Sequence, residues 1–176
     1  MRKNPYIRAL RIRQWPKNGF ILAPLVFDGQ LTNLPALSKT FAGFILLCIL
    51  YSGIYVFNDI QDIQSDRAHP RKKFRPIASG EISIRNAWLY ATILVLFSLI
   101  CAFVMDREFL LILCAILLIN IIYTQFVKHL PIIDVMAIGL LFILRVAAGA
   151  SLVIVKIFSP WIYIVTFMLA LYLGFG

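Results

Sequence analysis

Three of the eight acidic residues in this 176-residue chain fall within one short stretch, from Asn58 to Asp66. The carboxylates are Asp59, Asp62 and Asp66, and Asn58 adds a side-chain amide. Residues spaced by four lie on one face of a helix, so Asn58, Asp62 and Asp66 form one stripe, with Asp59 about 100° around the axis from Asn58. The pattern predicts four oxygen-bearing side chains near one helix end.

The chemistry suited to this acidic motif is the binding of a hard cation. Carboxylates at the end of an apolar helix repel one another and lose hydration, so they need a positive partner. Oxygen donors without a Cys or His pair suit Mg²⁺, which completes its octahedron with water and phosphate oxygens. We expect Asn58, Asp59, Asp62 and Asp66 to hold Mg²⁺, with the three aspartates catalytic. The alternative is a solvated helix end paired with the basic residues that follow.

A basic loop over residues 67–85 follows the acidic motif. Its cationic residues are Arg67, Arg71, Lys72, Lys73, Arg75 and Arg85. Such groups stabilise phosphate oxygens as charge develops on a leaving group. Membrane topology and lipid headgroups explain Arg71 and Arg85 equally well, whereas Arg75 lies between an aromatic residue and a proline and is the better candidate for a positioned group.

The composition of the chain says which elements must position these residues. Hydrophobic residues make up 61% and charged residues 14% of the chain, and the mean hydropathy is +0.89, far from the balance of soluble domains. A membrane-spanning helix needs about 20 apolar residues. The candidate spans are Trp15–Phe27, Phe41–Phe57, Ala87–Met105, Phe109–Val127, Ile132–Val155 and Trp161–Phe175. We expect an all-α fold, a multi-pass transmembrane helix bundle of about six spans, forming a single membrane domain over residues 1–176.

The distribution of Lys and Arg predicts the orientation of this bundle. Six basic residues precede the first span: Arg2, Lys3, Arg8, Arg11, Arg13 and Lys17. With the loop over 67–85 they face one side only if Trp15–Phe27 crosses the membrane, although that stretch is short and contains prolines. The positive-inside rule makes that side cytoplasmic, with Lys128 inside and Lys39, Arg107 and Lys156 outside. The basic residues flank membrane spans, so we expect no nucleic acid partner.

Three further polar residues lie within apolar spans: Asn120, Asp134 and Arg145. Ionisable groups inside a membrane are costly and are functional candidates for that reason. Asp134 and Arg145 are eleven residues apart, about three helical turns, so they do not pair on one helix. A role in binding helices to one another is the alternative for all three.

The motifs together resemble the UbiA-type intramembrane prenyltransferase superfamily. The resemblance rests on Asn58-Asp59-x-x-Asp62-x-x-x-Asp66 followed by Arg75-Pro76-Ile77-Ala78-Ser79-Gly80. Further stretches are similar to its decaprenyl-phosphate phosphoribosyltransferase branch: Arg11-x-Arg13-Gln14-Trp15-x-Lys17-Asn18, the loop from His69 to Pro76, and Lys128-His129 followed by Asp134 and Arg145. The resemblance implies a bundle of nine spans with a second polar motif beyond Gly176, so the chain looks like an N-terminal fragment, expected to be inactive alone.

The resemblance also implies substrates and the residues that bind them. We expect Mg²⁺-dependent transfer of a 5-phosphoribosyl group from phosphoribosyl diphosphate to a polyprenyl (decaprenyl) phosphate, with diphosphate released. The expected substrate-binding residues are Lys17, Asn18, Lys72, Lys73, Arg75, Asp134 and Arg145. The expected location is the bacterial inner membrane, with the N-terminus and active site cytoplasmic, and a homo-oligomer is compatible with the sequence. The alternatives are an aromatic prenyltransferase that uses a polyprenyl diphosphate and a non-enzymatic transporter or assembly partner.

Overall fold

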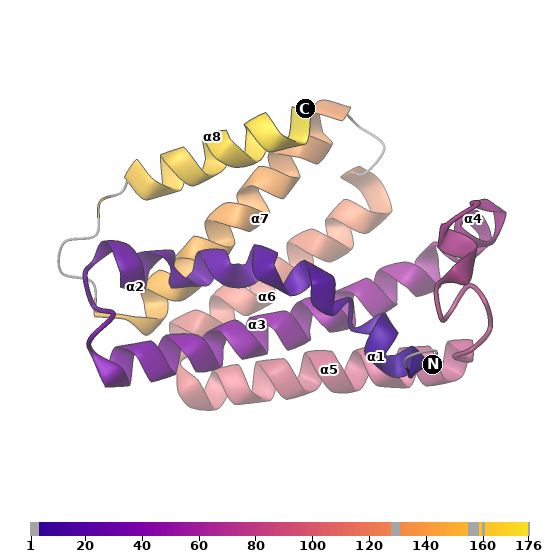
Figure 1. Cartoon of the computed structure of the whole chain (residues 1–176), viewed down its shortest axis with the longest axis horizontal. Helices are drawn as coiled ribbons and strands as arrows, with labels where there is room; N and C mark the ends of the chain where they lie inside the picture. The colour runs from indigo at the N-terminus through magenta and orange to yellow at the C-terminus, as the bar shows by residue number, and fades with distance from the viewer. Residues whose placement is uncertain (1–3, 128–130, 155–158, 160, 176) are drawn as a thin grey trace.

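The computed structural model describes residues 4–127, 131–154, 159 and 161–175, and these residues form helices and loops with no strand among them. Figure 1 shows an elongated bundle in which the long helices run side by side. The expected all-α helix bundle is therefore confirmed.

The five longer apolar stretches of the sequence each form one helix. They are α3 (Leu34–Gln61), α5 (Ile84–Met105), α6 (Arg107–Ile122), α7 (Pro131–Leu152) and α8 (Trp161–Phe175). The first four lie in stretches long and apolar enough to cross a membrane, where α6 continues into a π-helical turn, η3 (Tyr123–Val127). Helix α8, with 15 residues, is apolar but shorter.

The core of the bundle lies where α3 packs against α6. Leu47 and Leu50 of α3 and Phe109 and Leu113 of α6 are fully buried in one cluster. Gly53 of α3 faces α5, where a Cβ would come within 2.9 Å of a Val95 methyl carbon. A glycine at this position therefore lets α3 approach α5 closely, which brings the end of α3 beside the loop that precedes α5.

The N-terminal stretch differs from the single span that we predicted over Trp15–Phe27. It consists of α1 (Pro5–Ala9), the 3₁₀ helix η1 (Ile12–Leu22) and α2 (Ala23–Phe27). A 3₁₀ helix rises about 2.0 Å per residue and an α-helix about 1.5 Å, so the same number of residues spans a greater length in a 3₁₀ helix. Figure 1 shows this segment in indigo, running along α3 for most of its length. A Cβ on Gly149 of α7 would lie 1.9 Å from the Ile21 carbonyl oxygen, so only glycine permits the contact with η1.

The acidic motif is not one continuous helix, which corrects another expectation. Helix α3 ends at Gln61, and a short helix α4 (Ile63–Ala68) follows Asp62, which has φ −91° and ψ 9°. The amide of Asp62 still donates to Asn58 O at 2.9 Å, and that of Asp66 donates to Asp62 O at 2.8 Å. Because these bonds keep the four-residue spacing, the chain bends at Asp62 without losing the helical register.

The loop after α4 contains one short 3₁₀ turn before α5. Helix α4 ends before His69, and the 3₁₀ turn η2 (Lys72–Phe74) leads to residues 75–83. Ser83 caps α5 by accepting a hydrogen bond from the Asn86 amide at 3.2 Å.

The N-terminal segment and the basic loop meet at one end of the bundle. Arg8 Nη1 lies 2.8 Å from Glu81 Oε2, and Arg8 Nη2 donates to Phe74 O at 2.6 Å. Lys39 pairs with Asp106 at the opposite end, with Nζ 3.1 Å from Oδ2. Arg8 and the basic loop thus lie at the end of the bundle opposite Lys39, whereas Arg2, Lys3, Lys128, His129 and Lys156 lie outside the described residues.

Candidate functional site

Two carboxylates of the acidic motif are buried and share one arginine. Asp59 lies in the last turn of α3 and Asp66 in α4, and they are 2% and 1% exposed. Arg75 Nη1 donates to Asp66 Oδ2 at 2.7 Å and to Asp59 Oδ1 at 3.2 Å. A buried carboxylate without a cation is costly, so Arg75 supplies the compensation that the motif requires.

Arg11 is a second cation at the motif, which we did not predict as a site residue. Its Nη2 donates to Asp59 Oδ1, and its guanidinium carbon lies 5.0 Å from the centre of the Tyr55 ring. Arg11 joins α1 to η1 with φ +51°, a left-handed conformation that is uncommon for a residue with a side chain. Backbone strain of this kind is often retained at functional sites. Sequence reasoning placed Arg11 only in a basic N-terminal motif, because 48 residues separate it from Asp59.

An open cleft lies beside these charged groups. Its volume is about 570 Å³. It is lined by Arg8, Arg11, Arg13, Arg71 and Arg75, by Gln14 and Asp59, and by the apolar side chains of Ile7, Ile12, Phe74 and Pro76. A cleft with several cations concentrates anions near its walls. The cleft therefore has the charge to receive a phosphate group next to Asp59.

Asn58 and Asp62 complete the set of predicted metal donors. Asn58 Oδ1 accepts a hydrogen bond from Thr124 Oγ1 at 2.9 Å, and Asp62 is half-buried at the bend. Within the described ranges, no three His, Cys, Asp or Glu side chains gather closely enough to hold a metal by themselves. Mg²⁺ is usually held by one or two carboxylates together with water and substrate phosphates. The oxygen donors fit that type of site and not a closed protein cage.

The lysines predicted to bind substrate are exposed side chains. Lys72 and Lys73 are exposed on η2, and Lys73 Nζ lies 5.3 Å from the centre of the Phe74 ring. Lys17 is exposed on η1. In the part of the chain that the structure describes, the ion pairs of Asp59 and Asp66 come from arginines and not from these lysines.

Asn18 and Arg145 form a separate polar cluster deeper in the bundle. Arg145 Nε donates to Asn18 Oδ1 at 3.1 Å, and both residues are buried. The Arg145 guanidinium lies 4.3 Å from the centre of the Tyr51 ring and 4.7 Å from that of Phe142. Arg145 thus contacts other helices, as expected for a residue that binds helices to one another, which was the alternative to substrate binding. Asp134, at the start of α7, accepts a hydrogen bond from Tyr123 Oη at 2.7 Å.

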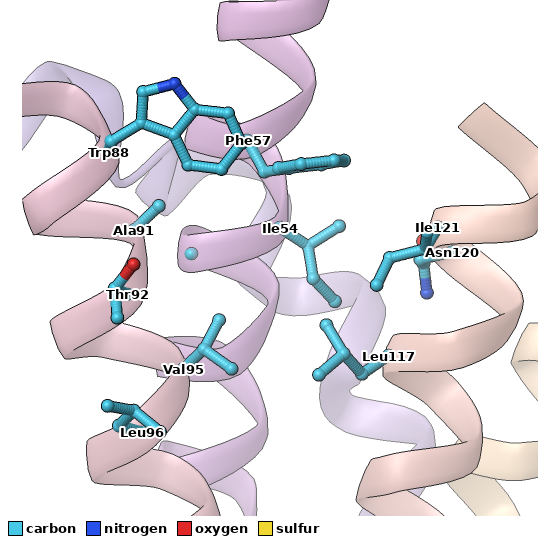
Figure 2. Close-up of a pocket in the computed structure, with 11 residues that line it drawn as sticks. Ile54, Phe57, Trp88, Ala91, Thr92, Val95, Leu96, Leu117, Asn120 and Ile121 are labelled. Atoms are coloured by element: carbon cyan, nitrogen blue, oxygen red, sulfur yellow. The ribbon is translucent and has the colours of Figure 1, made fainter. Parts of the chain in front are cut away.

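An apolar pocket lies between α3, α5 and α6, one turn from Asn58 (Figure 2). Its volume is about 210 Å³. It is lined by Gly53, Ile54, Phe57, Trp88, Ala91, Thr92, Val95, Leu96, Leu117, Asn120 and Ile121. Figure 2 shows Trp88 and Phe57 at one end, and their rings meet edge to face with centres 5.5 Å apart. Apolar side chains thus line most of this pocket.

Comparison with known proteins identifies the family. The profile of the UbiA prenyltransferase family matches residues 21–175. The chain belongs to the UbiA prenyltransferase family. The resemblance that the acidic motif and the basic loop indicated is thereby confirmed, and the match includes the whole of α3 to α7.

Individual UbiA relatives cover nearly all of this chain. It is 30% identical over 174 residues to the decaprenyl-phosphate phosphoribosyltransferase of Mycolicibacterium smegmatis, which is 97% of this chain and 54% of that protein. It is 35% identical over 158 residues to the uncharacterized protein y4nM of Sinorhizobium fredii, which is 90% of this chain and 30% of that protein. The chain therefore spans about half the length of the phosphoribosyltransferase and less of y4nM.

The fold of the UbiA chain also matches a solved structure. A UbiA homolog from Archaeoglobus fulgidus bound to GPP and Mg²⁺ superposes with a TM-score of 0.81 and 25% sequence identity. The superposition covers 97% of this chain and 61% of that one. The arrangement of helices seen in Figure 1 is thus a UbiA arrangement, and the homolog binds a divalent cation together with a diphosphate ester.

Proposed function

We propose that this UbiA chain takes part in transferring a 5-phosphoribosyl group from phosphoribosyl diphosphate to a polyprenyl phosphate. The observation that carries the proposal is the arginine-bridged pair Asp59 and Asp66 beside a cationic cleft. The similarity to the phosphoribosyltransferase of Mycolicibacterium smegmatis supports this choice of substrates. The proposal concerns the complete protein, because the chain covers about half of that relative.

The acidic motif is proposed to hold Mg²⁺ on the donor diphosphate. Asn58, Asp62 and Asp66 would supply oxygen ligands, with Asp59 beside them. Mg²⁺, when bound, acts as a Lewis acid that draws charge from the diphosphate oxygens. The binding of Mg²⁺ and GPP by the Archaeoglobus homolog supports this use of the motif.

The arginines are proposed to bind the diphosphate directly. Arg75 uses Nη1 for both carboxylates, and a guanidinium has five N–H donors in a planar fork, so Arg75 keeps donors for phosphate oxygens. Arg11 faces the same cleft, and Lys73 and Lys17 are further candidates. Donors placed where charge develops stabilise the transition state of bond cleavage.

The transfer itself requires little acid or base chemistry from the protein. A phosphate oxygen of the lipid forms a bond to ribose carbon 1, and the bond from that carbon to the diphosphate oxygen breaks, so the electron pair leaves with diphosphate. The attacking oxygen is already anionic and loses no proton. The chain would position the two substrates and keep water away from the reacting carbon. The apolar pocket of Figure 2 is a candidate for the isoprene units nearest the phosphate.

The reaction is proposed to take place at the cytoplasmic face of the membrane. The basic residues gather at the end of the bundle that carries the acidic motif. The positive-inside rule supports a cytoplasmic location for that end, at the bacterial inner membrane, where a water-soluble diphosphate donor would reach it.

A second candidate is an aromatic prenyltransferase that uses a polyprenyl diphosphate. The Archaeoglobus homolog favours this candidate, since it is bound to Mg²⁺ and to GPP, a prenyl diphosphate. Phosphoribosyl diphosphate and a polyprenyl diphosphate would both present a diphosphate to the proposed cation site. The two reactions differ in the group attached to the diphosphate and in the acceptor, so they are separated by supplying one pair of substrates at a time.

The test uses membranes that carry the complete reading frame of this protein. They are incubated with Mg²⁺, labelled phosphoribosyl diphosphate and polyprenyl phosphate, and separately with a polyprenyl diphosphate and an aromatic acid. We expect labelled lipid in the first reaction, and a loss of about 10² to 10³-fold or more in Asp62→Ala and Asp66→Ala, as when a group that stabilises transition-state charge is removed. The matched control is Glu108→Ala, an exposed carboxylate at the other end of the bundle.

The outcomes separate the two functions. If the first reaction yields no labelled lipid and the second yields a prenylated product, the proposed phosphoribosyltransferase function is wrong and the prenyltransferase function takes its place. Unchanged product formation in the two Asp variants would show that the acidic motif takes part in neither mechanism.

A further inference from the structure

One oxygen atom of Asp59 joins two arginines that come from different segments of the chain. Asp59 Oδ1 accepts a hydrogen bond from Arg11 Nη2 and another from Arg75 Nη1, the second at 3.2 Å. Arg11 lies between α1 and η1, Arg75 follows η2, and Asp59 belongs to the last turn of α3. Because both guanidinium groups contact the same atom, they are close neighbours although both are positively charged. The carboxylate between them offsets that repulsion.

The backbone around Arg11 is fixed to α3 independently of Asp59. Ser52 Oγ donates to Leu10 O at 2.8 Å and accepts a hydrogen bond from Trp15 Nε1 at 3.2 Å. These bonds lie on both sides of Arg11 in the sequence, and Ser52 is fully buried. Loss of the Asp59 charge would therefore release the Arg11 side chain without releasing the segment that carries it.

Asp59 is placed differently from the other oxygen donors of the acidic motif. Its position on a helix is about 100° around the axis from Asn58, and the donors spaced by four share the Asn58 side. The cleft of about 570 Å³ is lined by Asp59, Arg11 and Arg75, and its described lining residues do not include the rest of the motif. Asp59 thus belongs to the arginine side of the motif, and the stripe that starts at Asn58 belongs to the proposed cation side.

We infer that Asp59 is a positioning residue that holds Arg11 and Arg75 together as a two-arginine clamp for the diphosphate, and that it does not bind the metal. The inference rests on the proposed function of the acidic motif and deepens it. The two arginine donors occupy both lone-pair sites of Asp59 Oδ1, and two guanidinium charges beside a carboxylate repel a cation. Each guanidinium has five N–H donors in a planar fork, so donors remain for phosphate oxygens.

The test compares Asp59→Asn with Asp62→Asn in the purified full-length protein. Asparagine keeps the shape of the side chain and one oxygen acceptor but removes the charge. The affinity for Mn²⁺ alone is measured by electron paramagnetic resonance, and the affinity for inorganic diphosphate at saturating Mn²⁺ is measured by calorimetry. Asp106→Asn is the matched control, because Asp106 also pairs with a cation, Lys39, at the other end of the bundle.

We expect the two variants to show opposite patterns. Asp59→Asn should weaken diphosphate binding by about 10-fold to 100-fold, as for other residues that orient a binding group, and should lower the Mn²⁺ affinity far less than Asp62→Asn does. Asp62→Asn should have its larger effect on Mn²⁺. Asp106→Asn should stay near wild type in both measurements. In an Arg11→Gln background, the effect of Asp59→Asn on diphosphate binding should shrink, because one of the two arginines is already absent.

Three results would overturn the inference. They are a loss of Mn²⁺ affinity in Asp59→Asn as large as that in Asp62→Asn, wild-type diphosphate binding in Asp59→Asn, and an effect of Asp59→Asn that is undiminished in the Arg11→Gln background. If Asp59→Asn does not fold, as judged by its thermal midpoint, the double variant with Arg11→Gln removes both charges of the pair and is compared with Arg11→Gln alone. Equal Mn²⁺ affinity in these two proteins supports the inference, and a lower affinity in the double variant overturns it.

The result does not depend on the reaction that the protein catalyses. Both affinities are measured without turnover, and both candidate donors carry a diphosphate. Absence of phosphoribosyl transfer by a wild type that binds Mn²⁺ and diphosphate would refute the proposed reaction and leave the role of Asp59 intact.

Discussion

The two ends of the bundle each contain a carboxylate paired with a cation, and they use the pair differently. At one end, Lys39 and Asp106 are 3.1 Å apart, and their side chains are 37% and 24% exposed. At the other end, Arg75 and Asp66 are 2.7 Å apart, and the Asp66 side chain is only 2% exposed. An exposed pair contributes roughly 0–1 kcal/mol, whereas breaking a buried one is far more costly.

The hydrogen bonds of the carboxylates explain the difference. Asp106 caps α6, since its Oδ1 accepts from the amides of Glu108 at 2.9 Å and Phe109 at 3.2 Å. Asp59 and Asp66 instead bind arginines from other segments of the chain. One end therefore uses its carboxylate to start a helix, and the other pairs its buried carboxylates with arginines from other segments. Burial and partners distinguish a structural aspartate from a candidate functional one.

Removing Arg75 tests the buried end and should have the largest effect on stability. Arg75→Ala leaves Asp66 buried without its cation, which costs about 3–5 kcal/mol. The measurement is the thermal midpoint of the full-length protein purified in detergent, followed by tryptophan fluorescence. The double variant with Asp66→Asn removes the uncompensated charge and should recover much of the loss. A single variant as stable as wild type would show that the two ends do not differ.

Removing Asp106 tests the exposed end and should have a smaller effect. Asp106→Ala loses the cap of α6, which typically costs about 1 kcal/mol. Asp106→Asn keeps a good cap and should lie close to wild type in the same measurement. Turnover should be retained in both variants, because the proposed site lies at the other end. A loss of turnover that exceeds the loss of folded protein would contradict this separation.

The smallest expected effect is the pH dependence of the exposed end. Burial alone raises the pKa of Asp106, but the Lys39 hydrogen bond and the amides of Phe109 and Glu108 outweigh it and lower the pKa below its ordinary value. The ionised form is thus favoured in the fold. This stabilisation is present above the ordinary Asp pKa and is lost as pH falls through the lowered one. The difference in thermal midpoint between wild type and Asp106→Asn should shrink on acidification from about pH 7 to about pH 3. If the difference in thermal midpoint does not change with pH, the ionisation of Asp106 does not contribute to the stability of the fold.

Features set by neighbours in the chain were well predicted from the sequence. Apolar runs of about 20 residues predicted the long helices. The spacing of Asn58, Asp62 and Asp66 survives in the backbone hydrogen bonds. The bend at Asp62 and the 3₁₀ helix η1 were missed, because the sequence pattern does not distinguish these helical variants from a regular α-helix.

Features that join distant parts of the chain were decided by the tertiary structure alone. Arg11 reaches Asp59 across 48 residues, Thr124 reaches Asn58 across 66, and Arg145 reaches Asn18 across 127. Each side chain could be recognised from the sequence as polar in an apolar or basic setting, but its partner could not. Residue type and spacing determine helices and the local stripe of oxygens, because these depend on bonds between near neighbours. Which cation compensates a buried carboxylate depends on how the helices pack, and that is set by long-range contacts that no local pattern encodes.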